Sequence, residues 1–265
     1  MKKKIRIAYF GTPEFAASQL EAIINAGYEI AVVVTMPDKP AGRGRKIQYS
    51  DVKNTALQHG LPLLQPEKLK DPVFLEQLAS YHANLFVVVA FRMLPAVVWQ
   101  MPELGTFNLH ASLLPQYRGA APINFAIING ETETGLTTFF LNEEIDKGAI
   151  IMREHVSIRP DESAGELHDE LMVLGNKVIV ETIKKIESGD VAALPQEEMT
   201  ENQTLKPAPK ISKEFCNIDW NLDCQTIYNH IRGLSPYPAA HTKLISGNGE
   251  TIELKVFSSG IFYCL

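Results

Sequence analysis

The stretch from Ile5 to Thr35, IRIAYFGTPEFAASQLEAIINAGYEIAVVVT, holds two short apolar runs on either side of an amphipathic segment. The first run, IRIAYF, predicts a buried strand. Pro13 stands where a helix begins, because proline is favoured in the first helical turn. The helix is expected to end near Asn25, with Gly27 in the place of a C-terminal cap. The second run, EIAVVVT, predicts another buried strand, and the whole stretch indicates a parallel sheet covered by helices.

The same alternation continues beyond this stretch. After a glycine-rich insertion we expect a helix from about Ser50 to His59 and then an extended segment, LPLLQ. Asp71 and Pro72 supply the N-cap and the first position of a further helix, which leads into another buried run, NLFVVVA. The sequence therefore predicts an α/β fold with a Rossmann-like, mostly parallel sheet.

The pattern changes from Gly135 onward. GLTTFFLNEEIDKGAIIMREHVSI predicts two strands joined by a turn at residues 145–148, which would form an antiparallel edge of the sheet. Ser163 and Glu166 match a capping box at the start of a long amphipathic helix that ends at Gly189.

Composition predicts three parts of the chain. Residues 1–193 are expected to form one large domain, and residues 194–209, rich in Pro, Gln, Glu, Thr and Lys, a linker. Residues 210–265 are expected to form a second unit with a strand near 217–220, a helix near 224–232 and two more strands. So few elements cannot close a barrel around their own core, and we expect an incomplete small β-barrel domain.

Net charge, the spacing of cysteines and histidines, and the length of apolar runs limit the classes of function that this chain can have. A net charge of -6 argues against coating nucleic acid by overall charge, so any polyanion contact requires a local basic patch. Cys216, Cys224 and Cys264 form no CxxC pair and are expected to be reduced thiols. No signal peptide and no apolar run near the ~20 residues of a membrane helix is found, which predicts a cytoplasmic protein. The histidines lack metal-ligand spacing, so no metal is expected.

A polar pair stands on the predicted strand GTFNLH. The period of two places Asn108 and His110 on one face, at the end of the strand where open α/β sheets bind ligands. A lone histidine there is more often a structural residue, but the same-face asparagine makes the pair a catalytic candidate. Asparagine can donate to an oxyanion and histidine can accept a proton near neutral pH. Asp146 is a candidate for a supporting charge, although an aspartate in such a turn usually has only a turn role.

These side chains suit the direct transfer of an acyl group to an amine through a tetrahedral intermediate, which requires no Ser or Cys nucleophile. The segments AYFGTPEFA, PDKPAGRGRK, FNLHASLLPQYRGAAPI and GLTTFFL…IDKGAI, in this order, resemble the folate-dependent formyltransferases over essentially the whole chain. The resemblance implies that Asn108, His110 and Asp146 are catalytic and that 10-formyltetrahydrofolate is the formyl donor. It implies initiator methionyl-tRNA as the acceptor and an oligonucleotide-binding type of barrel at the C-terminus.

The resemblance also implies binding residues. Those for the donor are Ser112, Leu113, Leu114, Pro115, Phe91, Arg92, Met93 and Leu94. The chain departs from the family pattern at Phe91 and Arg92, which leaves their side-chain roles open. Those for tRNA are Lys39, Arg43, Arg45 and Lys46. An isolated basic run is more often a solvated loop, but the family places this loop against the acceptor stem. Arg118 has two equally supported interpretations, a functional residue or an anchor of its loop.

Other functions stay open at this point. An amino-sugar N-formyltransferase, or a hydrolase that releases formate from the same folate, would keep the chemistry and change the acceptor. A nicotinamide enzyme is disfavoured, because the first turn, FGTPEF, lacks the G-x-G-x-x-G pattern. An RNA-binding module without catalysis is the remaining alternative. The basic loop and the partial barrel favour tRNA as the partner, and a monomer is expected.

Overall fold

The computed structural model describes residues 4–41, 46–199 and 204–261. The chain divides into two compact units. Unit 1 comprises Met1–His110, Thr137–Arg153 and Met172–Met199, and unit 2 comprises Ala111–Leu136, Glu154–Leu171 and Thr200–Leu265. Within the described residues, no helix has the length and apolar character needed to cross a membrane.

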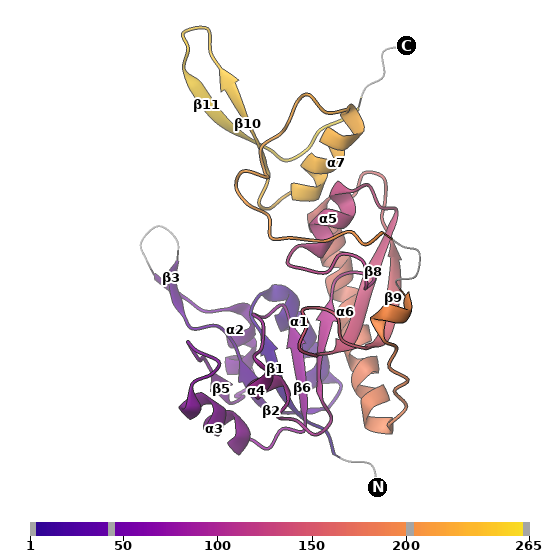
Figure 1. The fold of residues 1–265 in the computed structure, drawn as a ribbon. Coiled ribbons are helices and arrows are strands. Elements are labelled where there is room, and N and C mark those ends of the chain that lie inside the picture. Colours follow the sequence, from indigo (N-terminus) through magenta and orange to yellow (C-terminus); the bar gives the residue numbers. More distant parts are fainter. Residues whose placement is uncertain (1–3, 42–45, 200–203, 262–265) are drawn as a thin grey trace. The chain divides into compact units, whose positions relative to one another are not determined.

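A seven-stranded sheet in the order β5-β2-β1-β6-β7-β8-β9 is the main element of the fold (Figure 1). The strands are β1 (Arg6–Gly11), β2 (Glu29–Val34), β5 (Leu63–Leu64), β6 (Leu85–Val89), β7 (Thr106–His110), β8 (Glu133–Phe140) and β9 (Ile150–Ser157). The pairs β1–β2, β1–β6, β2–β5 and β6–β7 are parallel, whereas β7–β8 is antiparallel. The predicted mostly parallel sheet with an antiparallel edge is therefore confirmed.

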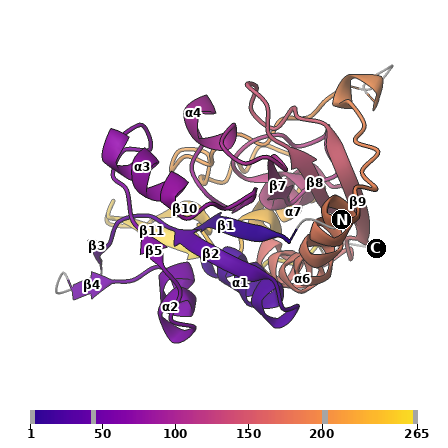
Figure 2. The ribbon, with the colours of Figure 1, turned by 90° about the horizontal axis from the view of Figure 1, so that it is seen from below.

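Helices cover both faces of the sheet. Figure 2 shows α1 (Glu14–Asn25) and α6 (Ala164–Ser188) on one face, and α3 (Pro72–Ser80) and α4 (Ala96–Trp99) on the other. The buried core on the α3 and α4 face includes Ala8, Phe10, Val32, Val34, Phe74, Leu78, Phe86, Val88 and Val98. On the opposite face, the Tyr9 hydroxyl donates a hydrogen bond of 2.6 Å to the carbonyl of Ala16 in α1. α2 (Asp51–Gln58) packs beside α1.

The predicted helix ends are confirmed. Ser50 caps α2 by accepting from the Lys53 amide at 3.1 Å, and Asp71 caps α3 by accepting from the Val73 amide at 2.9 Å. Gly27 ends α1 with φ at +83°, a conformation that glycine adopts without a steric penalty. At the start of α6, the Glu166 carboxylate accepts from the Ser163 amide at 2.8 Å, which completes the capping box.

The glycine-rich insertion differs from the loop that we expected. Its two flanks form short strands, β3 (Lys39–Ala41) and β4 (Lys46–Gln48), which pair antiparallel with Lys39 opposite Gln48. Pairing gives the backbone of both flanks hydrogen-bond partners that an open loop would have to find in water. Arg43 and Arg45 lie outside the described residues.

Unit 2 contains α5 (Pro122–Ile128), α7 (Cys224–Leu234) and a two-stranded antiparallel sheet of β10 (Ala240–Ile245) and β11 (Thr251–Val256). Its buried residues include Cys216, Ile218, Ile231, Leu234 and Ala240. The helix and the two strands were predicted. Cys216 and Cys224 are free thiols, as predicted, and Cys264 lies outside the described residues.

The strand predicted near residues 217–220 is wrong in its extent. Asn217 forms a single bridge with His241, and no longer ladder is found there within the described part of the chain. The Asp219 carboxylate accepts from the Asn221 amide at 3.0 Å, and this local turn competes with strand pairing.

Candidate active site

β7 carries the predicted catalytic pair near the centre of the sheet. Its parallel neighbour β6 places Val88 opposite Asn108, and its antiparallel neighbour β8 places Thr137 opposite His110. Asn108 is half-buried, whereas His110 is 8% exposed. A strand that is paired along both edges fixes the backbone on which both side chains stand.

Two contacts show which face each side chain occupies. Thr138, the partner of Leu109 in the ladder, shares a hydrogen bond of 2.9 Å with Thr182 of α6. Leu109 also points to α6, since a Cβ added at Gly175 would lie 3.3 Å from its Cδ2 atom. Because neighbours along a strand alternate, Asn108 and His110 face away from α6, on the side of the sheet that α3 and α4 cover. This arrangement agrees with the prediction that Asn108 and His110 share one face of the strand.

Asp146 lies in the turn that connects β8 to β9. Its φ is +53°, in the left-handed region that aspartate tolerates better than most residues. The amide of Gln196 holds the turn by donating hydrogen bonds of 2.9 Å to the carbonyls of both Asp146 and Gly148. Gln196 is fully buried in η1 (Gln196–Met199). Gln196 falls in the polar segment predicted to be a linker, whose composition does not distinguish this residue from its neighbours.

The turn is long enough to return toward His110. Phe140, the last residue of β8, pairs with Phe107, so the turn starts beside the beginning of β7. The three steps from Phe107 to His110 rise about 10 Å along the strand. The six residues from Phe140 to Asp146 can span up to about 20 Å. Asn108, His110 and Asp146 all belong to unit 1.

The donor-binding residues predicted in unit 1 follow β6. Phe91 packs edge-on against Phe10 with ring centroids 5.8 Å apart, and Leu94 is buried in the same core. Arg92 donates to the Glu67 carbonyl at 2.8 Å and to the Pro66 carbonyl. Met93 is 73% exposed. A cavity of about 580 Å³ adjoins this segment and is lined by Leu69, Lys70, Arg92, Met93, Pro95, Ala96 and Val97.

The predicted donor-binding residues of unit 2, Ser112 to Pro115, begin two residues after His110. Ser112 and Leu114 are fully buried, and the Ser112 hydroxyl donates a hydrogen bond of 2.7 Å to the Gln116 carbonyl. The backbone amide of Gln116 in turn donates a hydrogen bond of 3.1 Å to the Leu113 carbonyl. The segment is therefore a turn that its own hydrogen bonds stabilise.

A cluster of polar side chains joins the two ends of the β3–β4 hairpin. Lys53 donates to the Asp38 carboxylate at 2.5 Å and to the side chain of Gln65 at 3.0 Å. Gln65 donates to Asp38 at 2.8 Å and to the Met36 carbonyl at 2.9 Å. The hydrogen bonds from Lys53 and Gln65 lower the pKa of Asp38. This cluster fixes the base of the segment that carries the predicted tRNA-binding residues Lys39, Arg43, Arg45 and Lys46.

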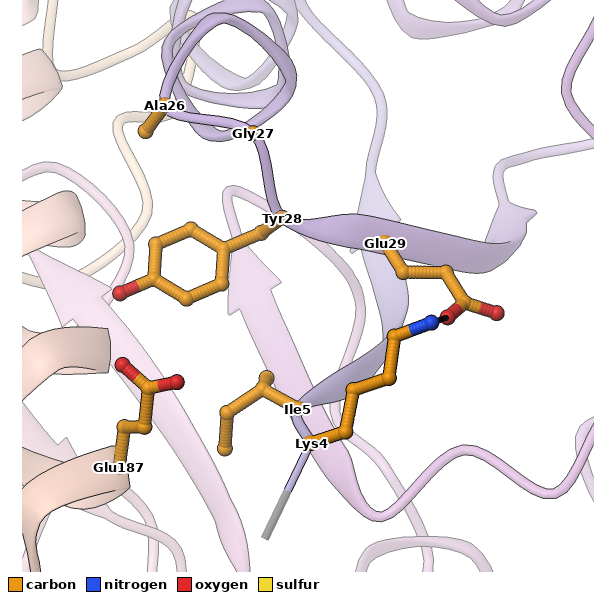
Figure 3. A pocket seen from close by; sticks show the side chains of 7 residues that line it. All are labelled: Lys4, Ile5, Ala26, Gly27, Tyr28, Glu29 and Glu187. Atoms are coloured by element: carbon orange, nitrogen blue, oxygen red, sulfur yellow. Dashed lines mark ion pairs between the residues drawn. The ribbon is translucent and has the colours of Figure 1, made fainter. Parts of the chain in front are cut away.

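A second cavity, of about 630 Å³, lies at the opposite edge of the sheet, before the starts of β1 and β2 (Figure 3). Its charged groups have partners, since Lys4 pairs with Glu29 at 2.9 Å. Tyr28 points toward Glu187, and burial together with this carboxylate raises the pKa of the tyrosine. Ligands of open α/β sheets bind beyond the carboxyl ends of the strands, so the site around β7 is the better candidate.

Comparison with known proteins shows the family of the chain. The family model "Formyl transferase" matches residues 3–183, and "Formyl transferase, C-terminal domain" matches residues 210–261. The Methionyl-tRNA formyltransferase of Bacteroides fragilis is 57% identical over 258 residues, which cover 97% of this chain and 80% of that protein. The Methionyl-tRNA formyltransferase of Flavobacterium johnsoniae is 55% identical over 257 residues, with the same two coverages.

Solved structures share the fold. A 4-N formyltransferase from Francisella tularensis has a TM-score of 0.72 at 17% identity, covering 97% of this chain and 99% of that chain. A sugar N-formyltransferase from a Shewanella species has a TM-score of 0.70 at 16% identity, covering 98% of this chain and all of that chain. The chain belongs to the formyl transferase family, and within it to the methionyl-tRNA formyltransferases.

Proposed function

We propose that this chain transfers the formyl group of 10-formyltetrahydrofolate to the α-amino group of the methionine carried by initiator methionyl-tRNA. The observation that supports this most strongly is the 57% identity to a methionyl-tRNA formyltransferase over 97% of the chain. Identity to the sugar formyltransferase of similar fold is only 16%, which gives an amino sugar less support as the acceptor.

Asn108, His110 and Asp146 are proposed to be the catalytic residues. The amine nitrogen attacks the formyl carbon, and the carbonyl oxygen gains negative charge in the tetrahedral intermediate. The Asn108 amide donates to this oxyanion, a contribution worth on the order of 10²–10³ in rate in comparable sites. His110 accepts the proton that the amine loses and delivers it to the folate nitrogen as the bond between carbon and that nitrogen breaks. The Asp146 carboxylate supports the charged imidazole.

The binding residues are proposed on the family pattern. Ser112 to Pro115 and Phe91 to Leu94 would contact the donor. Ser112 and Leu114 are buried and the Ser112 hydroxyl is hydrogen-bonded, which suits a preformed loop. Lys39, Arg43, Arg45 and Lys46 would contact the phosphates of the acceptor stem. The three parts predicted from composition, 1–193, 194–209 and 210–265, stay proposals. The monomeric state also stays a proposal, and so does a location in the cytoplasm, the compartment that supplies charged initiator tRNA.

The decisive test is incubation with 10-formyltetrahydrofolate and charged initiator tRNA, scored as N-formylmethionine released from the tRNA. Two control reactions separate the alternatives. Formate release without tRNA would indicate a hydrolase, and formylation of a nucleotide-linked amino sugar would indicate the other acceptor class. Absence of N-formylmethionine with folded protein would contradict the proposal.

A further inference from the structure

Two segments of unit 2 lie against each other along their backbones. The first is the loop of residues 112–121, here called the donor loop because it contains Ser112 to Pro115. The second is residues 204–208, here called the brace. The Tyr117 amide donates to the Lys206 carbonyl at 2.8 Å, and the Ala208 amide donates to the Arg118 carbonyl at 2.8 Å. The Ala120 amide donates to the Ala208 carbonyl at 2.7 Å, and Gly119 and Ala208 form an isolated parallel β-bridge.

A side-chain amide strengthens this pairing. Gln116 donates to the Thr204 carbonyl at 3.2 Å and accepts from the Lys206 amide at 2.9 Å, so it uses both its donor and its acceptor on the brace. The carbonyl of the same residue accepts from the Ser112 hydroxyl. The contact therefore extends from the brace to the first residue of the donor loop.

A charged cluster lies at the centre of the contact. The Tyr117 hydroxyl donates to Glu131 at 2.5 Å, and Lys206 donates to the same carboxylate oxygen at 2.6 Å. Burial would raise the pKa of Glu131, but the hydrogen bonds from Lys206 and Tyr117 and the lysine charge hold it below its usual value. Tyr117 is 4% exposed and packs with Phe125 and Ala208. Both hydrogen bonds are thus charge-assisted, the stronger class of hydrogen bond.

The donor loop has a backbone conformation that requires such support. Tyr117 has φ at +59°, which costs a residue with a side chain on the order of 1–3 kcal/mol. Gly119 has φ at +127°, and a Cβ there would lie 2.3 Å from the carbonyl oxygen of Ala208. The brace thus adds hydrogen bonds to a loop that holds Tyr117 in a disfavoured backbone conformation.

We infer that the brace is a positioning element for the formyl donor, with Lys206, Tyr117 and Glu131 as positioning residues. This inference rests on the proposed function. A ligand that binds only one loop conformation has an apparent Kd that rises as the populated fraction of that conformation falls. Loss of the brace contacts is therefore expected to weaken folate binding and to leave the chemical step unchanged at saturating donor.

The test compares Lys206→Met and Tyr117→Phe with the wild type, using 5-formyltetrahydrofolate as the probe in equilibrium binding. Each variant is expected to raise the Kd about fivefold, the effect of one lost hydrogen bond of ordinary net strength, because the Glu131 carboxylate is partly exposed. Because both donors bind one carboxylate of Glu131, the double variant should raise the Kd by less than the product of the two single effects. Lys206→Arg should restore binding to within about twofold. Lys184→Met removes an exposed lysine of α6 and serves as the control.

Formylation kinetics and thermal unfolding complete the test. In formylation assays the KM for the donor should rise with the Kd, while kcat and the KM for tRNA stay constant. A lower Tm with an unchanged folate Kd would overturn the inference, because it would show a purely structural role. A higher KM for tRNA with an unchanged folate Kd would also overturn it and assign Lys206 to RNA contact. If the wild type binds folate without formylating methionyl-tRNA, the proposed function fails, and the folate Kd values alone decide on the brace.

Discussion

The turn that contains Asp146 can be perturbed without changing any proposed catalytic residue. Gln196→Leu removes an amide that donates to the carbonyls of Asp146 and Gly148 and replaces it with a side chain of similar size. Each buried acceptor that loses its donor costs roughly 1–3 kcal/mol. The Asp146 carbonyl belongs to a half-buried residue and can be partly rehydrated, so the total is about 2–4 kcal/mol.

The lost hydrogen-bond energy destabilises a turn whose residues, 141–149, belong to no β-strand. A change of about 2–4 kcal/mol shifts the ratio of ordered to displaced turns by roughly thirtyfold or more. We expect kcat for formylation to fall by about tenfold or more, because the carboxylate proposed to support His110 would be displaced for much of the time. The KM values should change by less than about threefold, because the two hydrogen bonds from Gln196 go to the turn and not to either proposed binding segment.

The assay is steady-state formylation at saturating donor and tRNA, together with thermal unfolding. Gln77→Leu, at an exposed position of α3, is the matched control and should change neither quantity. Unchanged kcat in a Gln196→Leu variant with a lower Tm would contradict the proposed role of the turn, because the turn would then stabilise the fold without taking part in the chemistry. A KM effect without a kcat effect would refute it as well.

Three further predictions concern other parts of the site. Asn108→Ala should lower kcat about 100- to 1000-fold with the Tm unchanged within about 2 °C, and near-normal turnover would contradict its role. Arg43→Ala should weaken tRNA binding and reduce its slope against log salt by about one, whereas an equal loss of folate binding would contradict a tRNA contact. Lys53→Met should raise the KM for tRNA several-fold and lower the Tm. Because Lys53 holds the pKa of Asp38 below its usual value, its stabilisation is present above pH ~4 and is lost as the pH falls through the lower folded value. The Tm difference from wild type should therefore shrink as the pH falls below about 4, and a constant difference would contradict this.

Interactions between residues close together in the sequence were sufficient to predict most of the helices and strands. The apolar runs that became β1, β2 and β6, the caps at Ser50 and Asp71, and the capping box at Ser163 depend on residues a few positions apart. The face of Asn108 and His110 also follows from the alternation within five residues. Such signals survive in a single sequence because the interactions that they report are themselves local.

The elements that were missed depend on partners far along the chain. Residues 204–208 have the composition of a linker, and their pairing with residues 117–120 depends on contacts across about 90 positions. Gln196 is one polar residue in a polar segment, and only the fold places it beside the turn of Asp146. The strand expected near Asn217 is short because Asp219 forms a local turn, a competition that the apolar pattern does not reveal.

The double pairing of β7 limits which insertions and deletions the protein can tolerate. One residue gained or lost between Thr106 and His110 would exchange the two faces of the strand. An amide and an imidazole would then enter the hydrocarbon packing against α6, and two apolar groups would take the positions where formyl transfer is proposed. Loop lengths elsewhere can change among descendants of this gene, but the spacing within these five residues should stay invariant. In a library of single-codon insertions and deletions, no active variant should carry its change within this segment.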